Sequence, residues 1–180
     1  KNGNFVLNVE LLPDGTIPPE HKAIMDEFGS WLKLNGEAIY ATAPWKVHGD
    51  NLLSGLDDDA SDIANLANTD VVDQKRKSVQ FNNRTKNSPD YGYDQVRFTT
   101  KGDLLYIFVL NPTEGEIELP ALGLASEYNP NQIQTMKLIG SDEEIQYKQT
   151  MDKLTINIPA QRPNKYAVVF EVKGAMYSGN

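Results

Sequence analysis

The sequence has no cysteine among its 180 residues, which excludes disulfide bonds, cysteine nucleophiles and thiolate metal sites. It also lacks any run of about 18 apolar residues, so no membrane-spanning helix is predicted. Only two histidines are present, His21 and His48, and they lie too far apart to suggest a metal site or a Ser-His-Asp triad. We therefore predict no metal and no cofactor.

Positive charge is also scarce. The chain has 17 Lys and Arg against 25 Asp and Glu, and its net charge of −8 argues against a nucleic-acid partner. Hydrophobic residues make up 39% and charged residues 23%, which is ordinary for a folded domain in water. A chain of this length can hold one domain, or one small domain and part of another.

The first 44 residues predict a strand, a loop and a helix. The apolar run Phe5–Val9 is typical of a strand that a parallel sheet buries on both faces. Pro18-Pro19-Glu20 indicates a helix start, and Asn35-Gly36 closes the helix with residues that accept a left-handed conformation. The helix carries one apolar stripe, formed by His21, Ile24, Met25, Phe28, Trp31 and Leu32.

Such a strand is buried only between parallel neighbours, and the rest of the chain offers none. Residues 1–44 therefore read as the last repeat of a larger domain, with a boundary near Pro44-Trp45 and Trp45 packed between domains. Residues 45–94 read as a linker and interface loops, in which we expect an edge strand around Ser78–Phe81 and a short helix at Ala60–Leu66.

Residues 95–180 carry seven short candidate strands separated by turn residues, with no helical crossover between them. This pattern predicts an antiparallel β-sandwich in which Leu104–Leu110, apolar on both faces, is central. The candidate strands are Val96–Thr100, Leu104–Leu110, Glu116–Leu119, Gln134–Ile139, Glu144–Lys148, Lys153–Ile158 and Tyr166–Val172.

The order of these residues resembles the end of the α-L-fucosidases of glycoside hydrolase family 29. The resemblance is more specific in residues 2–45, which contain Gly3-Asn4, Asp14-Gly15-Thr16-Ile17-Pro18 and Gly29-Ser30-Trp31-Leu32-Lys33-Leu34-Asn35-Gly36-Glu37-Ala38-Ile39-Tyr40. A second, less specific match runs from Val96 to Val172, beginning Arg97-Phe98-Thr99-Thr100-Lys101-Gly102-Asp103. The resemblance implies the last strand and helix of a catalytic (β/α) barrel, followed by the family's C-terminal β-sandwich.

The same resemblance implies retaining hydrolysis by an Asp nucleophile and a Glu acid/base. Both lie on barrel strands before the one that begins this chain, so no catalytic residue is assigned and the chain alone is expected to be inactive. It further implies an exported protein (periplasmic, extracellular or lysosome-like) that meets a fucosylated glycan through the barrel.

One departure from the family pattern, Glu10-Leu11-Leu12-Pro13, alters the loop at the end of the barrel strand. Asn8 and Glu10 stand at that end, where barrel enzymes place their active sites, and are the candidate substrate-adjacent residues. A purely structural role in the loop is the more ordinary reading of both.

Two further interpretations stay open. The sandwich could be a non-catalytic carbohydrate-binding module, which predicts two or three coplanar exposed aromatic rings; Tyr91 and Tyr93 are candidates. An acidic cluster at Asp57-Asp58-Asp59 and Asp62 is better explained as a solvated charge run than as a calcium site.

Because the Phe5–Val9 strand has no partners in this chain, self-association through residues 1–40 is also expected.

Overall fold

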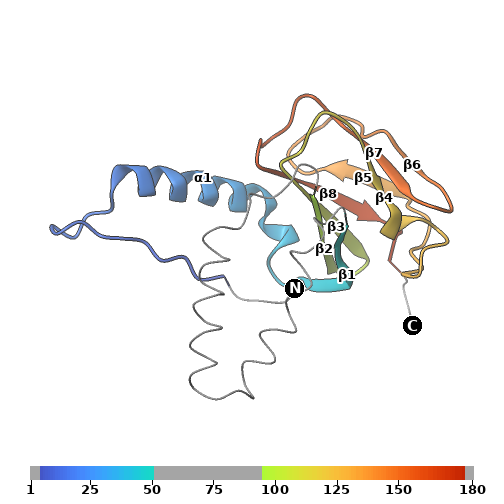
Figure 1. Cartoon of the computed structure of the whole chain (residues 1–180), viewed down its shortest axis with the longest axis horizontal. Helices are drawn as coiled ribbons and strands as arrows, with labels where there is room; N and C mark the ends of the chain where they lie inside the picture. Colours follow the sequence, from blue (N-terminus) through green and yellow to red (C-terminus); the bar gives the residue numbers. More distant parts are fainter. Residues whose placement is uncertain (1–4, 51–94, 177–180) are drawn as a thin grey trace, which may run out of the picture.

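The computed structural model describes residues 5–50 and 95–176, which form one long α-helix beside two antiparallel sheets (Figure 1). The helix is α1 (Pro19–Asn35), and it runs on into the 3₁₀ turn η1 (Gly36–Ala38). The larger sheet has the order β1 (Ala43–Asp50), β2 (Gln95–Lys101), β3 (Leu104–Leu110), β8 (Ala167–Lys173) and β5 (Thr135–Leu138). The smaller has the order β4 (Gly115–Leu119), β7 (Leu154–Ile158) and β6 (Tyr147–Gln149), and the 3₁₀ turn η3 (Pro120–Leu122) follows β4.

The predicted β-sandwich is confirmed, and each of the seven candidate strands overlaps an observed one. β3 spans the predicted residues and is the middle strand of its sheet, pairing with β2 on one side and β8 on the other. β7 alternates as expected, since Leu154, Ile156 and Ile158 are buried while Asn157 is exposed. These residues join apolar side chains of the larger sheet in one core between the sheets.

The first strand of the sandwich was not predicted. β1 begins at Ala43 and pairs with β2, so residues 45–50 belong to the sheet and not to the predicted linker. Trp45 is 7% exposed and packs edge-on against Phe98 in the core, with ring centroids 5.1 Å apart, so its predicted place between domains is also wrong. The register of β1 shifts between Pro44 and Gly49, which interrupts the alternation that marks a strand in sequence. The remaining predictions for 51–94 lie outside the described residues.

The predicted strand at Phe5–Val9 is wrong. Residues 5–12 belong to no strand, and most of their side chains are exposed. The apolar run fits a buried strand only when parallel neighbours flank it, and the part of the chain that the structure describes supplies none.

The predicted helix is confirmed at both of its ends. Gly36, however, does not adopt the left-handed conformation that glycine often takes at a helix C-terminus. Gly36 has φ −59°, a right-handed value, and the chain continues into η1. A Cβ at this position would lie 2.8 Å from the Tyr40 ring. Glycine therefore lets the Tyr40 ring approach the backbone closely here, and no left-handed turn is involved.

The outer face of the larger sheet carries a second apolar cluster, covered by the end of α1 and by η1. Tyr106, Phe108 and Val169 lie buried there with Ala38, and Trp31, Leu104 and Ile139 pack around them. Thr99 Oγ1 donates a hydrogen bond of 2.7 Å to the Ala38 carbonyl and ties η1 to β2. β3 is consequently buried on both faces.

Two glycines differ in their surroundings: Gly140 contacts the C-terminal part of α1, which packs on the sheet, and Gly29 lies on α1 itself. Gly140 has φ +81°, and a Cβ there would come within 2.8 Å of the Leu34 side chain. Gly29 lies on the helix with nothing within 4 Å of its Cβ position. We predict that Gly140→Ala lowers the free energy of unfolding by about 1–2 kcal/mol because of the left-handed backbone, whereas Gly29→Ala raises it by about 0.5–1 kcal/mol. Urea unfolding followed by circular dichroism measures both, and equal effects would contradict this account.

The Tyr106 hydroxyl is fully buried and has no hydrogen-bond partner among the described residues. Burial, with the carboxylates of Glu37 and Glu171 nearby, raises the pKa of Tyr106 to about 12. Below pH 10 the hydroxyl is protonated in both folded and unfolded chains; between about pH 10 and 12 only the unfolded chain loses the proton, so stability falls as pH rises.

We therefore predict that Tyr106→Phe leaves stability at pH 7 unchanged or slightly higher, because it removes an unpaired polar group. The same variant should lose less stability than the unmodified chain on going to pH 11. Urea unfolding at the two pH values, with Tyr147→Phe as a control at a half-buried position, tests this. A loss of more than about 1 kcal/mol at pH 7 would show that the hydroxyl makes a favourable bond.

Candidate functional site

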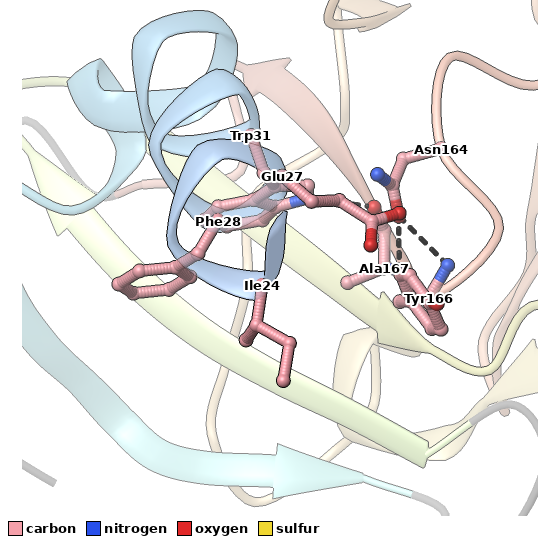
Figure 2. Close-up of a pocket in the computed structure, with 7 residues that line it drawn as sticks. All are labelled: Ile24, Glu27, Phe28, Trp31, Asn164, Tyr166 and Ala167. Atoms are coloured by element: carbon pink, nitrogen blue, oxygen red, sulfur yellow. Dashed lines mark hydrogen bonds between the residues drawn. The ribbon is translucent and has the colours of Figure 1, made fainter. Parts of the chain in front are cut away.

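A pocket of about 390 Å³ opens where α1 meets the segment that leads into β8. Figure 2 shows the helix residues on one side and the segment residues on the other. It is lined by Ile24, Glu27, Phe28, Trp31, Asn164, Tyr166 and Ala167. Its size lies in the range of ligand pockets, and five of its seven residues are apolar or aromatic.

Trp31 joins the helix to the sheet at the base of this pocket. Its indole Nε1–H donates a hydrogen bond of 2.9 Å to the Ala167 carbonyl. Its ring lies 6.3 Å from that of Phe108, on the outer face of β3. This fits the predicted place of Trp31 on the apolar stripe of the helix, and its indole donor is already used within the fold.

Asn164 fixes the segment that leads into β8, on the side of the pocket opposite the helix. Its Oδ1 accepts hydrogen bonds from the backbone N–H groups of Tyr166 at 2.7 Å and Ala167 at 3.2 Å (Figure 2). This is an Asx-type turn that fixes the approach to β8. Since the Asn164 oxygen and the Trp31 donor both face protein groups, most of the wall left to a ligand is apolar.

The rim carries one charge of each sign. Lys165 Nζ lies over the Tyr166 ring, 4.7 Å from its centroid. Hydrogen bonding to Tyr166, the charge of Tyr166 and then the charge of Glu27 raise the pKa of Lys165. Glu27 and Lys165 are therefore close enough to interact across the edge of the pocket.

The pocket has no catalytic pair. Glu27 is the only carboxylate among its lining residues, whereas glycoside hydrolysis by acid and nucleophile needs two carboxyl groups. Within residues 5–50 and 95–176, no group of three or more His, Asp or Glu is placed to hold a metal ion. The lining is therefore mostly apolar, and it lacks the two carboxyl groups that glycoside hydrolysis needs.

Asn8 and Glu10, the predicted substrate-adjacent residues, lie on the extended segment before α1. Both are exposed, and neither lines the pocket. The structure thus does not bring them together with the pocket residues, and their role at a substrate stays a prediction.

The two histidines do not line the pocket either. His21 is half-buried on α1 and His48 is half-buried on β1. Asp57–Asp59, Asp62, Tyr91 and Tyr93 lie outside the described residues. Sequence reasoning missed the pocket because its residues come from positions 24–31 and 164–167, and the spacing of the first set indicated only a helix face.

Exposed apolar side chains gather at the helix end of the molecule. Of the thirteen large hydrophobic residues exposed in the described part, eleven lie between residues 5 and 40. They are Phe5, Val6, Leu7, Leu11, Leu12, Ile17, Ile24, Phe28, Leu34, Ile39 and Tyr40. A concentration of this kind marks an interaction surface. No helix of the described residues is long and apolar enough to span a membrane.

Comparison with known families gives two matches, in chain order. The family model "Alpha-L-fucosidase" matches residues 1–37, and "Alpha-L-fucosidase C-terminal domain" matches residues 89–173. The first match contains the whole of α1, and the second contains β2 to β8.

Curated relatives are α-L-fucosidases of animals. The chain is 41% identical over 54 residues to the enzyme of Branchiostoma floridae, a match that covers 30% of this chain and 12% of that protein. It is 47% identical over 45 residues to human tissue α-L-fucosidase, covering 25% of this chain and 10% of that enzyme. The match thus spans about a tenth of the length of these relatives.

Solved structures share the fold over nearly the whole chain. The Thermotoga maritima α-fucosidase aligns with TM-score 0.59 and 23% identity, over 94% of this chain and 30% of that one. Isoenzyme 1 of Paenibacillus thiaminolyticus gives TM-score 0.58 and 24% identity, over 96% and 31%. A family 29 α-L-fucosidase of Bacteroides thetaiotaomicron, described as a trapped covalent intermediate, gives TM-score 0.52 and 18% identity, over 95% and 29%.

At these identities the structural likeness shows the fold, and the family assignment rests on the two consecutive sequence matches. Their order, together with a helix docked on a β-sandwich, agrees with one part of one family. The chain belongs to the α-L-fucosidases of glycoside hydrolase family 29 and corresponds to their C-terminal region.

Proposed function

We propose that this chain is the C-terminal part of a retaining α-L-fucosidase, which releases L-fucose from glycoconjugates, and that it supports the catalytic barrel without supplying either catalytic carboxylate. The observation that carries the proposal is the docking of α1, which lies within the first family match, onto strands β3 and β8, which lie within the second. The substrate, a fucosylated glycan, is bound by the barrel in this proposal.

The supporting role follows from how firmly α1 and η1 are held. Trp31 bonds to the backbone of β8, and Thr99 of β2 bonds to the backbone of η1. Lys101 and Glu37 add an ion pair of 3.7 Å between β2 and η1. These bonds fix α1 and η1 to two strands of the sandwich. In this proposal the helix therefore sets the position of the sandwich relative to the rest of the barrel.

Two observations support the mechanism and its location outside this chain. The Bacteroides thetaiotaomicron neighbour is described as a covalent intermediate, which is the species that distinguishes retaining hydrolysis. The pocket of the present chain holds a single carboxylate among its lining residues, so it lacks the pair about 5–5.5 Å apart that retention needs.

Export of the protein is part of the same proposal. One relative, 42% identical over 50 residues, is named plasma α-L-fucosidase of Homo sapiens.

The carbohydrate-binding alternative receives less support. Among the described residues of the sandwich, Trp45, Phe98, Tyr106, Phe108 and Phe170 are buried, and Tyr166 is the one exposed aromatic residue. Its ring is covered on one face by Lys165. A binding module needs several open rings on one surface, whereas this sandwich uses its rings for packing.

We predict that the purified 180-residue chain releases no aryl alcohol from an aryl α-L-fucoside above a buffer blank, because both carboxylates are absent. A complete family 29 α-L-fucosidase under the same conditions is the positive control. Calorimetric titration with L-fucose should likewise show no binding. Hydrolysis by the chain would overturn the proposal, and fucose binding without hydrolysis would favour the binding module.

A further inference from the structure

One asparagine of the described chain is followed by glycine, where α1 ends and η1 begins; we call residues 35–38 the α1–η1 corner. Because glycine has no Cβ, its backbone nitrogen meets little steric hindrance and can attack the side-chain amide of the preceding residue. A bond forms between the Gly36 nitrogen and Asn35 Cγ, and Asn35 Nδ2 leaves as ammonia, which carries away the proton of the Gly36 N–H. Water then opens the five-membered imide at either C–N bond, so the product is aspartate or isoaspartate.

The folded corner does not allow this ring to close. Asn35 has φ −106° and ψ 4°. A ψ near zero places the Gly36 nitrogen almost eclipsed with the Asn35 backbone nitrogen, and so turns it away from the side-chain carbon that it must reach. The Asn35 Nδ2 also donates a hydrogen bond of 3.1 Å to the Trp31 carbonyl, and Asn35 is 2% exposed. The folded chain therefore holds Asn35 in a conformation that does not react.

Contacts with the larger sheet hold the corner in that conformation. Ala38 is fully buried, and its carbonyl accepts the hydrogen bond of 2.7 Å from Thr99 Oγ1 on β2. The Gly36 carbonyl accepts a hydrogen bond of 2.7 Å from the Tyr40 N–H. Figure 1 shows that α1 reaches the sheets at this end. Rotation about ψ of Asn35 thus requires η1 to leave the sheet, so the reaction rate should follow the equilibrium population of the open corner.

Neither product fits the docked corner. Aspartate places a carboxylate at a nearly fully buried position, with an acceptor in place of the donor that meets the Trp31 carbonyl. Two acceptors cannot bond to each other, and a buried charge without a partner is costly. The negative charge also lies at the C-terminal end of α1, where the helix dipole opposes it. Isoaspartate adds a carbon to the backbone, which displaces Ala38 relative to Thr99.

We propose that Asn35 is a deamidation site that reacts only when the α1–η1 corner leaves the sheet, and that the reaction makes this separation permanent. The cover over Tyr106 and Phe108 is then lost, since both are buried beneath this end of the helix. The inference goes beyond the proposed function, because it concerns the lifetime of the docked helix and no step of fucoside hydrolysis.

The first test compares the rate of deamidation at Asn35 in the folded 180-residue chain and in the same chain unfolded in urea, at mildly alkaline pH. Peptide mapping by mass spectrometry detects the replacement of the amide by a carboxyl group and separates aspartate from isoaspartate. We expect the folded chain to react about 100-fold more slowly or less, within the range that local opening sets. In urea, Asn2-Gly3 is an internal reference of the same sequence type, and Gly36→Ala should slow the reaction only at Asn35.

The second test weakens a contact that holds the corner. Thr99→Val removes the donor to the Ala38 carbonyl at nearly constant side-chain size. It should raise the rate at Asn35 in the folded chain between about twofold and tenfold, the effect of one hydrogen bond. Thr155→Val is the matched control, because Thr155 is half-buried on β7 of the smaller sheet, and it should leave the rate unchanged. In urea, both variants should react at the rate of the unmodified chain.

The third test places the product in the chain directly. Asn35→Asp should speed hydrogen exchange at the backbone amides of residues 36–40 by about tenfold or more, because the corner opens locally. Asn35→Ala is the control, since it removes the same hydrogen bond without adding a charge, and it should speed this exchange less. Exchange in β7 should be unchanged in both variants, which checks that the sandwich is still folded.

Three results would overturn the proposal. Deamidation at equal rates in the folded chain and in urea would show that the corner does not protect Asn35. Equal rates in Thr99→Val and Thr155→Val would show that the reaction does not follow the release of the corner. Exchange in Asn35→Asp no faster than in Asn35→Ala would show that the corner docks again with the charge in place. None of these results depends on fucoside hydrolysis, so failure here is distinct from failure of the proposed function.

Discussion

The rest of this structure depends on the burial of β3 on both faces. An antiparallel sheet can leave one face to water, but here the outward side chains of Tyr106 and Phe108 on β3 and of Val169 on β8 are all buried. They need a cover that the sandwich itself does not contain. α1 and η1 supply it, which is why a helix at the start of the chain is fixed to strands near its end.

This cover divides the helix into two halves with different surroundings. Around Trp31 and Asn35 the helix packs on the sheet, and Asn35 is buried with its Nδ2 donating to the Trp31 carbonyl at 3.1 Å. Around Ile24 and Phe28 the same apolar stripe is exposed. Only the C-terminal half of the apolar stripe is therefore covered by the sheet. The pocket lies between this covered half and the exposed half.

The strands were predictable from sequence where local alternation decides the outcome. Leu154, Ile156 and Ile158 show this, and so does the doubly apolar run Leu104–Leu110. β1 escaped prediction because its register shift and Pro44 break the alternation. The strand predicted at Phe5–Val9 is wrong for the opposite reason. Its local pattern is that of a strand, but a strand also needs neighbouring strands to pair with, and the described residues provide none. The pocket could not be predicted, since its two walls are more than 130 residues apart in sequence.

The polar groups of two pocket residues, Asn164 and Trp31, are already hydrogen-bonded within the fold. Sugar recognition needs donors and acceptors turned toward the ligand, but the Asn164 oxygen and the Trp31 nitrogen are turned toward the backbone of residues 166 and 167. Those bonds shape the segment before β8 and fasten it to the helix. A family fold hosts function only through its sites. In this region the Trp31 donor joins the helix to β8 and the Asn164 oxygen fixes the segment before β8, so both of these polar groups are already bonded within the fold.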